Sequence, residues 1–145
     1  MIIHREDGYQ LSTDPERIDL GLVHHWLSTD AFWALGRSRE VVEQSVRGSV
    51  VFGVYGPDGG QVAFARVVTD HATFGWLCDV YVDPGQRGRG LGTWLAEAVV
   101  EHLRPYALKR LMLSTLDAHE VYAKAGFVPF PDPEKLMVLP GRQSG

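Results

Sequence analysis

The hydrophobic and polar positions of the chain form patterns that predict both strands and helices. Three runs rich in β-branched and aromatic residues lie at 49–55, 61–69 and 73–82, and short turn segments such as 56–60 separate them. Runs of this kind, bounded by glycine, proline and aspartate, are typical of strands in an antiparallel meander. Residues 91–102 then repeat apolar side chains at helical spacing, which predicts a long helix directly after the third strand.

Weaker patterns before this meander predict one short strand and two helices. Residues 9–12 have the composition of a strand. Asp14 is followed by proline and predicts the start of a helix over 15–27, because aspartate caps helices and proline is favoured at the first helical position. Residues 38–48 predict a second helix, with its first residue, a serine, as the cap.

The C-terminal third continues the alternation of strands and helices. An apolar strand is expected over 110–115, and a short helix over 117–124 that an aspartate opens as part of a capping box. Further strands are expected to begin at 126–128 and to span 136–139. The tail from about Pro140 is expected to be loose.

These elements predict an α+β fold with a mixed, mostly antiparallel sheet and a helix that crosses between two neighbouring strands. A length of 145 residues suits one domain with its own core, so a single domain over 1–145 is expected. One cysteine leaves no internal disulfide framework, and the histidines show no metal-ligand spacing, so no metal is expected.

Composition and charge narrow the expected partners and location. No apolar run reaches the length of a membrane span, and the N-terminus lacks the shape of a signal peptide, so a cytoplasmic location without a membrane partner is expected. The formal net charge of −4 argues against nucleic acid as the main partner and is compatible with a cationic amine substrate. The sequence leaves open whether the chain forms a homodimer.

The stretch between the third meander strand and the long helix carries the strongest chemical signal. Asp83-Pro84-Gly85 has the composition of a turn, and Arg87-Gly88-Arg89-Gly90-Leu91-Gly92 runs straight into the helix. A glycine-rich turn at a helix start offers bare backbone N–H groups and the positive end of the helix dipole. Two arginines add charge where an anion would lie. The stretch therefore predicts a loop that binds phosphate or pyrophosphate.

The spacing in this loop disagrees with two common nucleotide-binding motifs. A P-loop requires a lysine after its last glycine, and no lysine lies nearby. A dinucleotide-binding fingerprint requires glycine where this chain has Thr93, and an acidic residue about 20 positions further on, where this chain has Leu108. A nucleotide-dependent enzyme is therefore disfavoured.

The pattern Arg87-x-x-Gly90-x-Gly92, between a strand and an amphipathic helix, resembles the coenzyme A motif of the GNAT superfamily of N-acetyltransferases. The later segment Val121-Tyr122-Ala123-Lys124-Ala125-Gly126-Phe127 also resembles a segment of that family, in which a tyrosine and two further residues precede x-Gly-Phe. Both motifs occur in the expected order. The resemblance implies a GNAT-like fold with helices on both sheet faces, in which the strands on either side of the central helix splay apart to hold the pantetheine arm.

The resemblance also implies acetyl-CoA as cosubstrate and a set of residues that contact it. The loop would take the pyrophosphate on its backbone, and the strand before it would offer N–H and C=O groups to the pantetheine amides and the thioester carbonyl. A threonine stands at the place of an asparagine that contacts the cofactor in many members. The implied cofactor residues are Val80, Tyr81, Val82, Arg87, Gly88, Arg89, Gly90, Leu91, Gly92, Thr93 and Thr115.

Two residues are candidates for catalysis. Tyr122 is implied as the general acid that protonates the departing thiolate. The common catalytic glutamate is missing, because Trp76 occupies its place, and Asp79 is the nearest acidic residue. An aspartate on a buried strand must be neutral, paired or exposed to the active-site gap, so it is either a base or a structural partner. Cys78 is expected to be inert, as buried cysteines usually are.

The acceptor stays unidentified. The family resemblance implies that the segment between the two predicted N-terminal helices, residues 31–40, lies over the acceptor site. The candidate substrate residues are Trp33, Arg37, Arg39, His71 and Trp76. The function expected is acetyl transfer from acetyl-CoA to a primary amine of a small molecule or peptide, by direct attack on the thioester. Because the glutamate is missing, a non-catalytic sensor or scaffold module that binds acyl-CoA stays an alternative.

Overall fold

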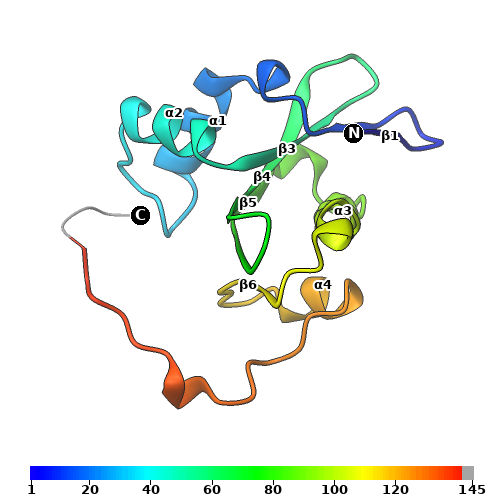
Figure 1. Ribbon diagram of the computed structural model, residues 1–145. Coiled ribbons are helices and arrows are strands. Elements are labelled where there is room, and N and C mark those ends of the chain that lie inside the picture. The colour runs from blue at the N-terminus through cyan, green and yellow to red at the C-terminus, as the bar shows by residue number, and fades with distance from the viewer. Residues whose placement is uncertain (142–145) are drawn as a thin grey trace.

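The computed structural model describes residues 1–141, so most of the tail predicted to be loose from Pro140 lies outside the described residues. One sheet of six strands forms the centre of this part of the chain, in the order β1-β2-β3-β4-β5-β6 (Figure 1). The strands are β1 (Ile2–His4), β2 (Gln10–Ser12), β3 (Val50–Tyr55), β4 (Gln61–Thr69), β5 (Phe74–Val82) and β6 (Arg110–Met112). The α-helices are α1 (Leu20–Thr29), α2 (Arg39–Arg47), α3 (Leu91–Leu103) and α4 (His119–Lys124).

The sheet is antiparallel except at one end. Strands β1 to β5 pair antiparallel with their sequence neighbours, whereas β5 and β6 pair parallel. The helix α3 makes the crossover between β5 and β6, as a parallel pair requires. The predicted α+β class, the meander and the crossover helix are therefore confirmed.

Alternating side chains on the strands build a hydrophobic core on each face of the sheet. Phe52 packs with α3 on one face, whereas its neighbour Val51 packs with α1 and α2 on the other. In the same way, Phe64 faces α1 and α2, and the alanines on either side of it face α3. Successive side chains of a strand point to opposite faces, which explains why these strands are apolar at nearly every position.

A β-bulge interrupts this alternation in β5. The pairing between β4 and β5 shifts between Phe64 and Arg66, and Asp79 has a φ of 53°, in the left-handed region. The extra residue of a bulge reverses which face the following side chains point to. Leu77 therefore packs on the α3 face, and Tyr81, four residues later, packs on the opposite face.

Strands β5 and β6 share only a short stretch of pairing. The register joins Phe74 to Arg110, Gly75 to Leu111 and Trp76 to Met112, and it ends there. The rest of β5 continues toward the glycine-rich loop without β6 beside it. This edge of β5 is therefore unpaired in the direction of that loop.

Several predicted element boundaries are wrong. The chain begins with a β1–β2 hairpin, of which only β2 was predicted. Asp14 does cap a helix, but this is a single 3₁₀ turn over Pro15–Arg17, and α1 starts separately with Asp19 as its cap. The predicted capping role of Asp117 is also wrong: Ala118 precedes α4 without a side-chain cap.

The two strands predicted at 126–128 and 136–139 do not form. After α4 the chain runs away from the sheet as an extended arm, which we define as residues 128–141 (Figure 1). Its only regular element is a 3₁₀ turn at Pro133–Lys135. The residues at 136–139 have the composition of a strand, but the arm carries them away from the sheet, and they have no strand beside them.

Candidate functional site

The glycine-rich loop forms a tight path between β5 and α3. Asp83 accepts a hydrogen bond from the N–H of Gly85 (3.2 Å), which fixes the first turn. Gly88 and Gly90 then adopt φ values of 85° and 73°, a region that costs residues with a Cβ about 1 kcal/mol or more. Gly90 precedes α3 and supplies no side-chain cap. The first N–H groups of α3 therefore point out of the helix start without a side-chain acceptor.

A small pocket of about 210 Å³ lies against this helix start. It is lined by Val82, Gln86, Arg87, Gly88, Gly90, Leu91, Gly92, Thr93 and Val121. A Cβ added to Gly88 or Gly90 would meet no protein atom within 4 Å, so packing does not require glycine at either position. Instead, the left-handed backbone conformation favours glycine at both positions, and the space in front of this backbone is open.

Arg87 is held at the rim of this pocket by three contacts. Its Nε donates to the carbonyl oxygen of Val82 (3.1 Å), and its guanidinium lies 5.5 Å from the centre of the Tyr81 ring. Its Nη2 lies 3.5 Å from a carboxylate oxygen of Asp30. Arg89, by contrast, is exposed on the loop. The loop thus presents one anchored arginine and one exposed arginine beside the open helix start.

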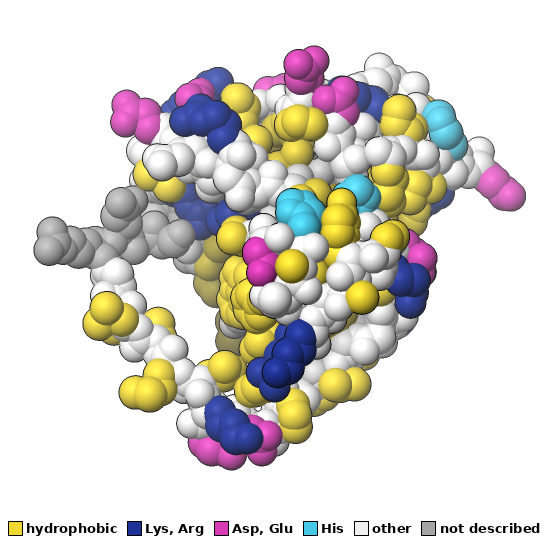
Figure 2. Space-filling view, viewed as in Figure 1, with side chains coloured by type: hydrophobic (Ala, Val, Ile, Leu, Met, Phe, Trp, Pro, Cys, Tyr) yellow, Lys and Arg dark blue, Asp and Glu magenta, His cyan; other side chains and the backbone are white. Residues whose placement is uncertain are grey.

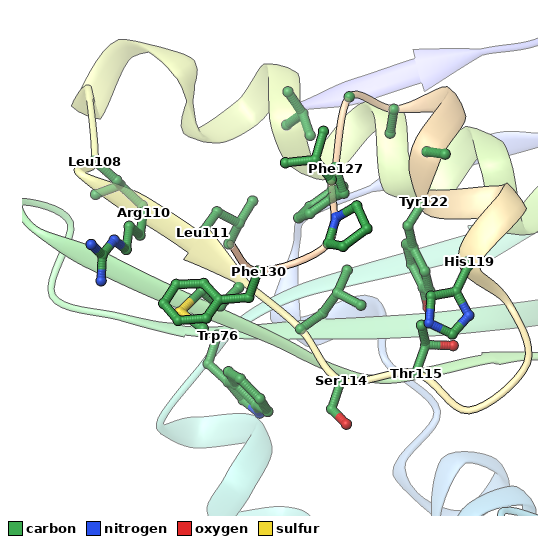
Figure 3. A pocket seen from close by; sticks show the side chains of 18 of the residues that line it. Trp76, Leu108, Arg110, Leu111, Ser114, Thr115, His119, Tyr122, Phe127 and Phe130 are labelled. Carbon is green, nitrogen blue, oxygen red and sulfur yellow. The ribbon is translucent and has the colours of Figure 1, made fainter. Parts of the chain in front are cut away.

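A much larger cavity, of about 1190 Å³, lies between β6, the C-terminal end of α3, α4 and the arm. Apolar side chains make most of its wall, and the polar exceptions include Ser114, Thr115 and His119. Figure 3 shows Tyr122 and His119 side by side on one side of this cavity, with Trp76 and Phe130 on the other. The cavity therefore contains the predicted general acid.

Helix α4 borders both the small pocket and the large cavity. Its residue Val121 lines the pocket at the loop, and the next residue, Tyr122, lines the cavity. Strand β5 also contributes to both spaces, with Trp76 in the cavity and Val82 in the pocket. An elongated ligand could therefore have one end at the helix start of α3 and the other beside Tyr122.

Tyr122 is half-buried and packs edge to face on Phe127, with ring centres 6.0 Å apart. Burial raises the pKa of its phenol, and the charge of Asp117 adds to this effect. The hydroxyl group therefore stays protonated at neutral pH. Tyr122 is in the state that donates a proton or a hydrogen bond.

Asp79 has three donors and almost no exposure to solvent. Its Oδ2 accepts from Arg37 (2.6 Å) and Arg66 (2.7 Å), and its Oδ1 accepts from the indole N–H of Trp33 (2.8 Å). Burial alone would raise the pKa of this carboxyl group, but the charge of Arg66 and the hydrogen bonds from both arginines outweigh it, and the pKa is lowered. Of the three states considered from the sequence, the structure shows the paired one.

Two of the candidate substrate residues, Trp33 and Arg37, contact Asp79. Arg37 is buried and directs its guanidinium to the carboxylate, and Trp33 joins the same group through its indole nitrogen. The sequence reasoning missed Arg66, which lies on β4 beside β5. A charged residue inside the apolar run of β4, with an aspartate on the next strand, is the signal that would have found it.

The strand residues before the loop differ in what they contact. Val80 and Val82 pack toward α3, whereas Tyr81 is buried on the other face and donates its hydroxyl proton to Asp30 (2.6 Å). Burial and this hydrogen bond raise the pKa of Tyr81 to about 12. Asp30 was not predicted from the sequence, yet it links Tyr81 with Arg87 at the rim of the loop.

Two candidate substrate residues lie apart from both cavities. Arg39 is on the exposed surface of α2, where it pairs with Glu43 at 2.9 Å. His71 lies in the turn before β5, at the strand end opposite the loop, and packs against Tyr106. Trp76, in contrast, lines the large cavity, and its role near the acceptor stays a prediction.

Thr115 and Cys78 have local roles in the structure. The hydroxyl oxygen of Thr115 accepts a hydrogen bond from the N–H of Ala118 (3.0 Å), so Thr115 shapes the turn that leads into α4. Burial raises the pKa of the Cys78 thiol to about 11. The thiol is therefore protonated at neutral pH, which makes it a poor nucleophile.

Residues 1–141 contain neither a cluster of metal ligands nor a helix that could span a membrane. This part of the chain brings no three histidine, cysteine, aspartate or glutamate side chains together as metal ligands. None of the helices described above has the length and apolar character needed to cross a membrane.

The arrangement of a glycine-rich loop, a strand that is unpaired along one edge and a tyrosine-lined cavity can be compared with known proteins. The model of the acetyltransferase (GNAT) family matches residues 20–127. The chain belongs to the GNAT family of acetyltransferases. An acetyltransferase, by its description, from Gibberella zeae is 32% identical to this acetyltransferase over 135 residues, covering 80% of this chain and 76% of the relative.

Solved structures agree with this assignment. A protein from Xanthomonas campestris described as a GNAT-family acetyltransferase is 43% identical, covers 92% of this acetyltransferase and 93% of its own chain, and superposes with a TM-score of 0.86. A Clostridium acetobutylicum protein, described as an acetyltransferase with acetyl-CoA, has a TM-score of 0.67 at 15% identity, with 97% and 96% of the two chains covered. The second likeness shows the fold alone.

Proposed function

We propose that this acetyltransferase moves the acetyl group of acetyl-CoA to a primary amine by direct attack on the thioester. One observation supports this most strongly: α4 places Tyr122 in a large cavity and its neighbour Val121 at the glycine-rich loop. A cosubstrate with an anionic end and a reactive end matches such a pair of linked spaces.

The loop has the features that the pyrophosphate of coenzyme A requires. Its open helix start offers N–H donors and a positive dipole end, and the space before Gly88 and Gly90 is free of protein atoms. Arg87 and Arg89 add positive charge. The unpaired edge of β5 at 80–82 would receive the pantetheine amides, in the way that a strand edge receives a peptide.

The reaction then needs one proton donor and one path for proton loss. The amine nitrogen attacks the thioester carbonyl carbon, a C–N bond forms, and the C–S bond breaks to release a thiolate. Tyr122, protonated at neutral pH, gives its proton to the thiolate sulfur and regains one from water. The proton lost by the amine passes to solvent, because Asp79 is buried between two guanidinium groups with a lowered pKa.

The acceptor is proposed only as a primary amine of a small molecule or peptide. The apolar wall of the large cavity favours an amine with an apolar body over a highly charged one. A cytoplasmic location and a single domain over residues 1–145 stay predictions from the sequence.

A panel of amines tests this proposal directly. Free thiol release from acetyl-CoA is measured with small amines, amino acids, aminoglycosides and peptides, and mass spectrometry follows the acceptor mass. Release that depends on the amine, with an acetylated product, is the expected result. Coenzyme A binding by calorimetry without release for any amine would instead favour the sensor or scaffold alternative, which the tryptophan at position 76 keeps open.

A further inference from the structure

The arm ends in an apolar segment that the described chain leaves uncovered. Leu136, Met137, Val138 and Leu139 are consecutive, and their exposed fractions are 54%, 98%, 84% and 92%. Isolated apolar side chains on a surface are ordinary, but four in a row with strand composition are a recognised risk for association. A partner surface that covers this segment would remove this risk.

The strand β6 has an unpaired edge. It pairs with β5 on one side and is the last strand in the order of the described sheet, so its other edge is open. Open edges present backbone N–H and C=O groups that readily pair with another strand. The large cavity lies beside β6, and hydrophobic side chains are visible on its wall and on the arm in Figure 2. Its volume of about 1190 Å³ exceeds the range of roughly 300–1,000 Å³ for small-molecule pockets.

The composition of the arm explains why the segment 136–139 does not return to its own β6. Pro129, Pro131 and Pro133 alternate with other residues. Proline fixes its own φ, and it also biases the residue before it toward an extended conformation. Residues 128, 130 and 132, which precede these prolines, are therefore biased toward extension, and the arm leads away from the body, as Figure 1 shows. A tight hairpin back to β6 would instead need residues that reverse the direction of the chain.

We propose that two copies of this chain exchange their arms, so that the segment 136–139 of each copy pairs with the open edge of β6 in the other. A four-residue strand spans about 13 Å, which is close to the roughly 10 Å of the three-residue β6. A single two-fold axis covers the apolar segment and pairs the β6 edge in both copies, because each chain carries the same segment and the same edge. No other partner is needed to cover the apolar surface.

The exchange also has a consequence for the cavity that contains Tyr122. Trp76, Tyr122 and the start of the arm already line this cavity. The segment from the second copy would form its remaining wall beside β6 and reduce the open volume toward that of a small-molecule pocket. The acceptor side of each site would then include side chains from both copies.

Light scattering on the full chain tests the assembly. The expected mass is twice the 16.1 kDa of one chain. Val138→Asp should give a monomer with an unchanged circular dichroism spectrum, because this side chain contacts little within its own chain. Ile2→Asp, which alters an exposed apolar residue on β1 at the opposite end of the sheet, is the matched control and should stay dimeric. A monomeric parent, or a dimer that Val138→Asp leaves intact, would overturn the proposal.

Disulfide trapping distinguishes exchange from a return of the segment to its own strand. In a Cys78→Ala background, chains with Met112→Cys and chains with Val138→Cys are co-expressed with tags of different size and then oxidised. Exchange predicts a disulfide between the two differently tagged chains. The Met112→Cys/Val138→Cys double variant must correspondingly form its disulfides between chains. If it instead forms an internal disulfide and runs as a monomer, the segment returns to its own sheet and the proposal is wrong.

Discussion

The two halves of the candidate site are held in different ways. The half at the loop depends on backbone conformation: Gly88 and Gly90 in the left-handed region, followed by an open helix start. The half around the β5 bulge depends on side chains from distant elements, because Trp33, Arg37 and Arg66 all converge on Asp79. A substitution in the first half should therefore change cofactor binding, whereas one in the second should change stability or chemistry.

The largest effect is expected at Asp79. Asp79→Asn removes the negative charge that both Arg37 and Arg66 contact, and asparagine tolerates the left-handed backbone that Asp79 adopts. Breaking a buried ion pair by removing one partner costs about 3–5 kcal/mol. Urea denaturation should show a loss of this size in the free energy of unfolding. Glu43→Gln is the control, since its ion pair with Arg39 is exposed and should cost less than about 1 kcal/mol.

The pH dependence of stability provides a second test of the same contact. The folded-state pKa of Asp79 is lowered, so its stabilising contribution is complete above the unfolded-state pKa of about 3.9 and is lost as the pH falls through the folded-state value. The parent should lose part of its stability in this acidic range, and Asp79→Asn should lack that part. If the variant keeps full stability but loses the acidic limb of the rate profile, Asp79 is a base after all.

The next largest effect is expected at Tyr122, on the rate rather than on stability. Tyr122→Phe keeps the ring contact with Phe127 but removes the proton donor, so kcat should fall by roughly 10²-fold while acetyl-CoA binding changes little. The exposed Tyr106 offers a control, because Tyr106→Phe should leave kcat unchanged. An unaltered kcat in Tyr122→Phe would mean that solvent protonates the thiolate.

The contrast between the two halves also explains what the sequence could predict. The loop and Tyr122 lie in short contiguous motifs, and local patterns of glycine, arginine and aromatic residues are readable without a structure. The contacts of Asp79 join residues 13 to 46 positions apart, and no local pattern encodes them. The sequence could state only that this carboxylate needs a partner.

The arm shows a different reason for failure. Residues 136–139 have the apolar composition of a strand, and the prediction rested on that composition alone. A strand also needs a neighbour to pair with, and three alternate prolines direct this segment away from its own sheet. Propensity described the segment correctly, but the pairing partner was not a local property of the sequence.

A smaller effect is expected from the loop, and it should appear in cofactor affinity. Gly90→Val places a β-branched residue in the left-handed region, which costs about 1–3 kcal/mol, and adds a side chain at the helix start. The dissociation constant of coenzyme A should therefore rise at least about tenfold in calorimetry. Gly59→Val imposes a similar strain at a φ of 90° in a remote turn, so it controls for strain alone. Equal coenzyme A affinity in the two variants would remove the loop from the binding site.

The smallest effect is expected at Thr115, which sets the start of α4, the helix that borders both the loop pocket and the large cavity. Thr115→Ala removes the acceptor for the N–H of Ala118 and should cost about 1 kcal/mol of stability, the usual value of a lost helix-start hydrogen bond. Because α4 carries Tyr122, kcat should fall a few-fold as the Tyr122 hydroxyl is positioned less well. Thr115→Ser keeps the oxygen and should restore both values. If Thr115→Ala instead raises the KM for acetyl-CoA and leaves stability and kcat unchanged, then the hydroxyl contacts the cosubstrate, as the family resemblance implied, and does not act through the helix.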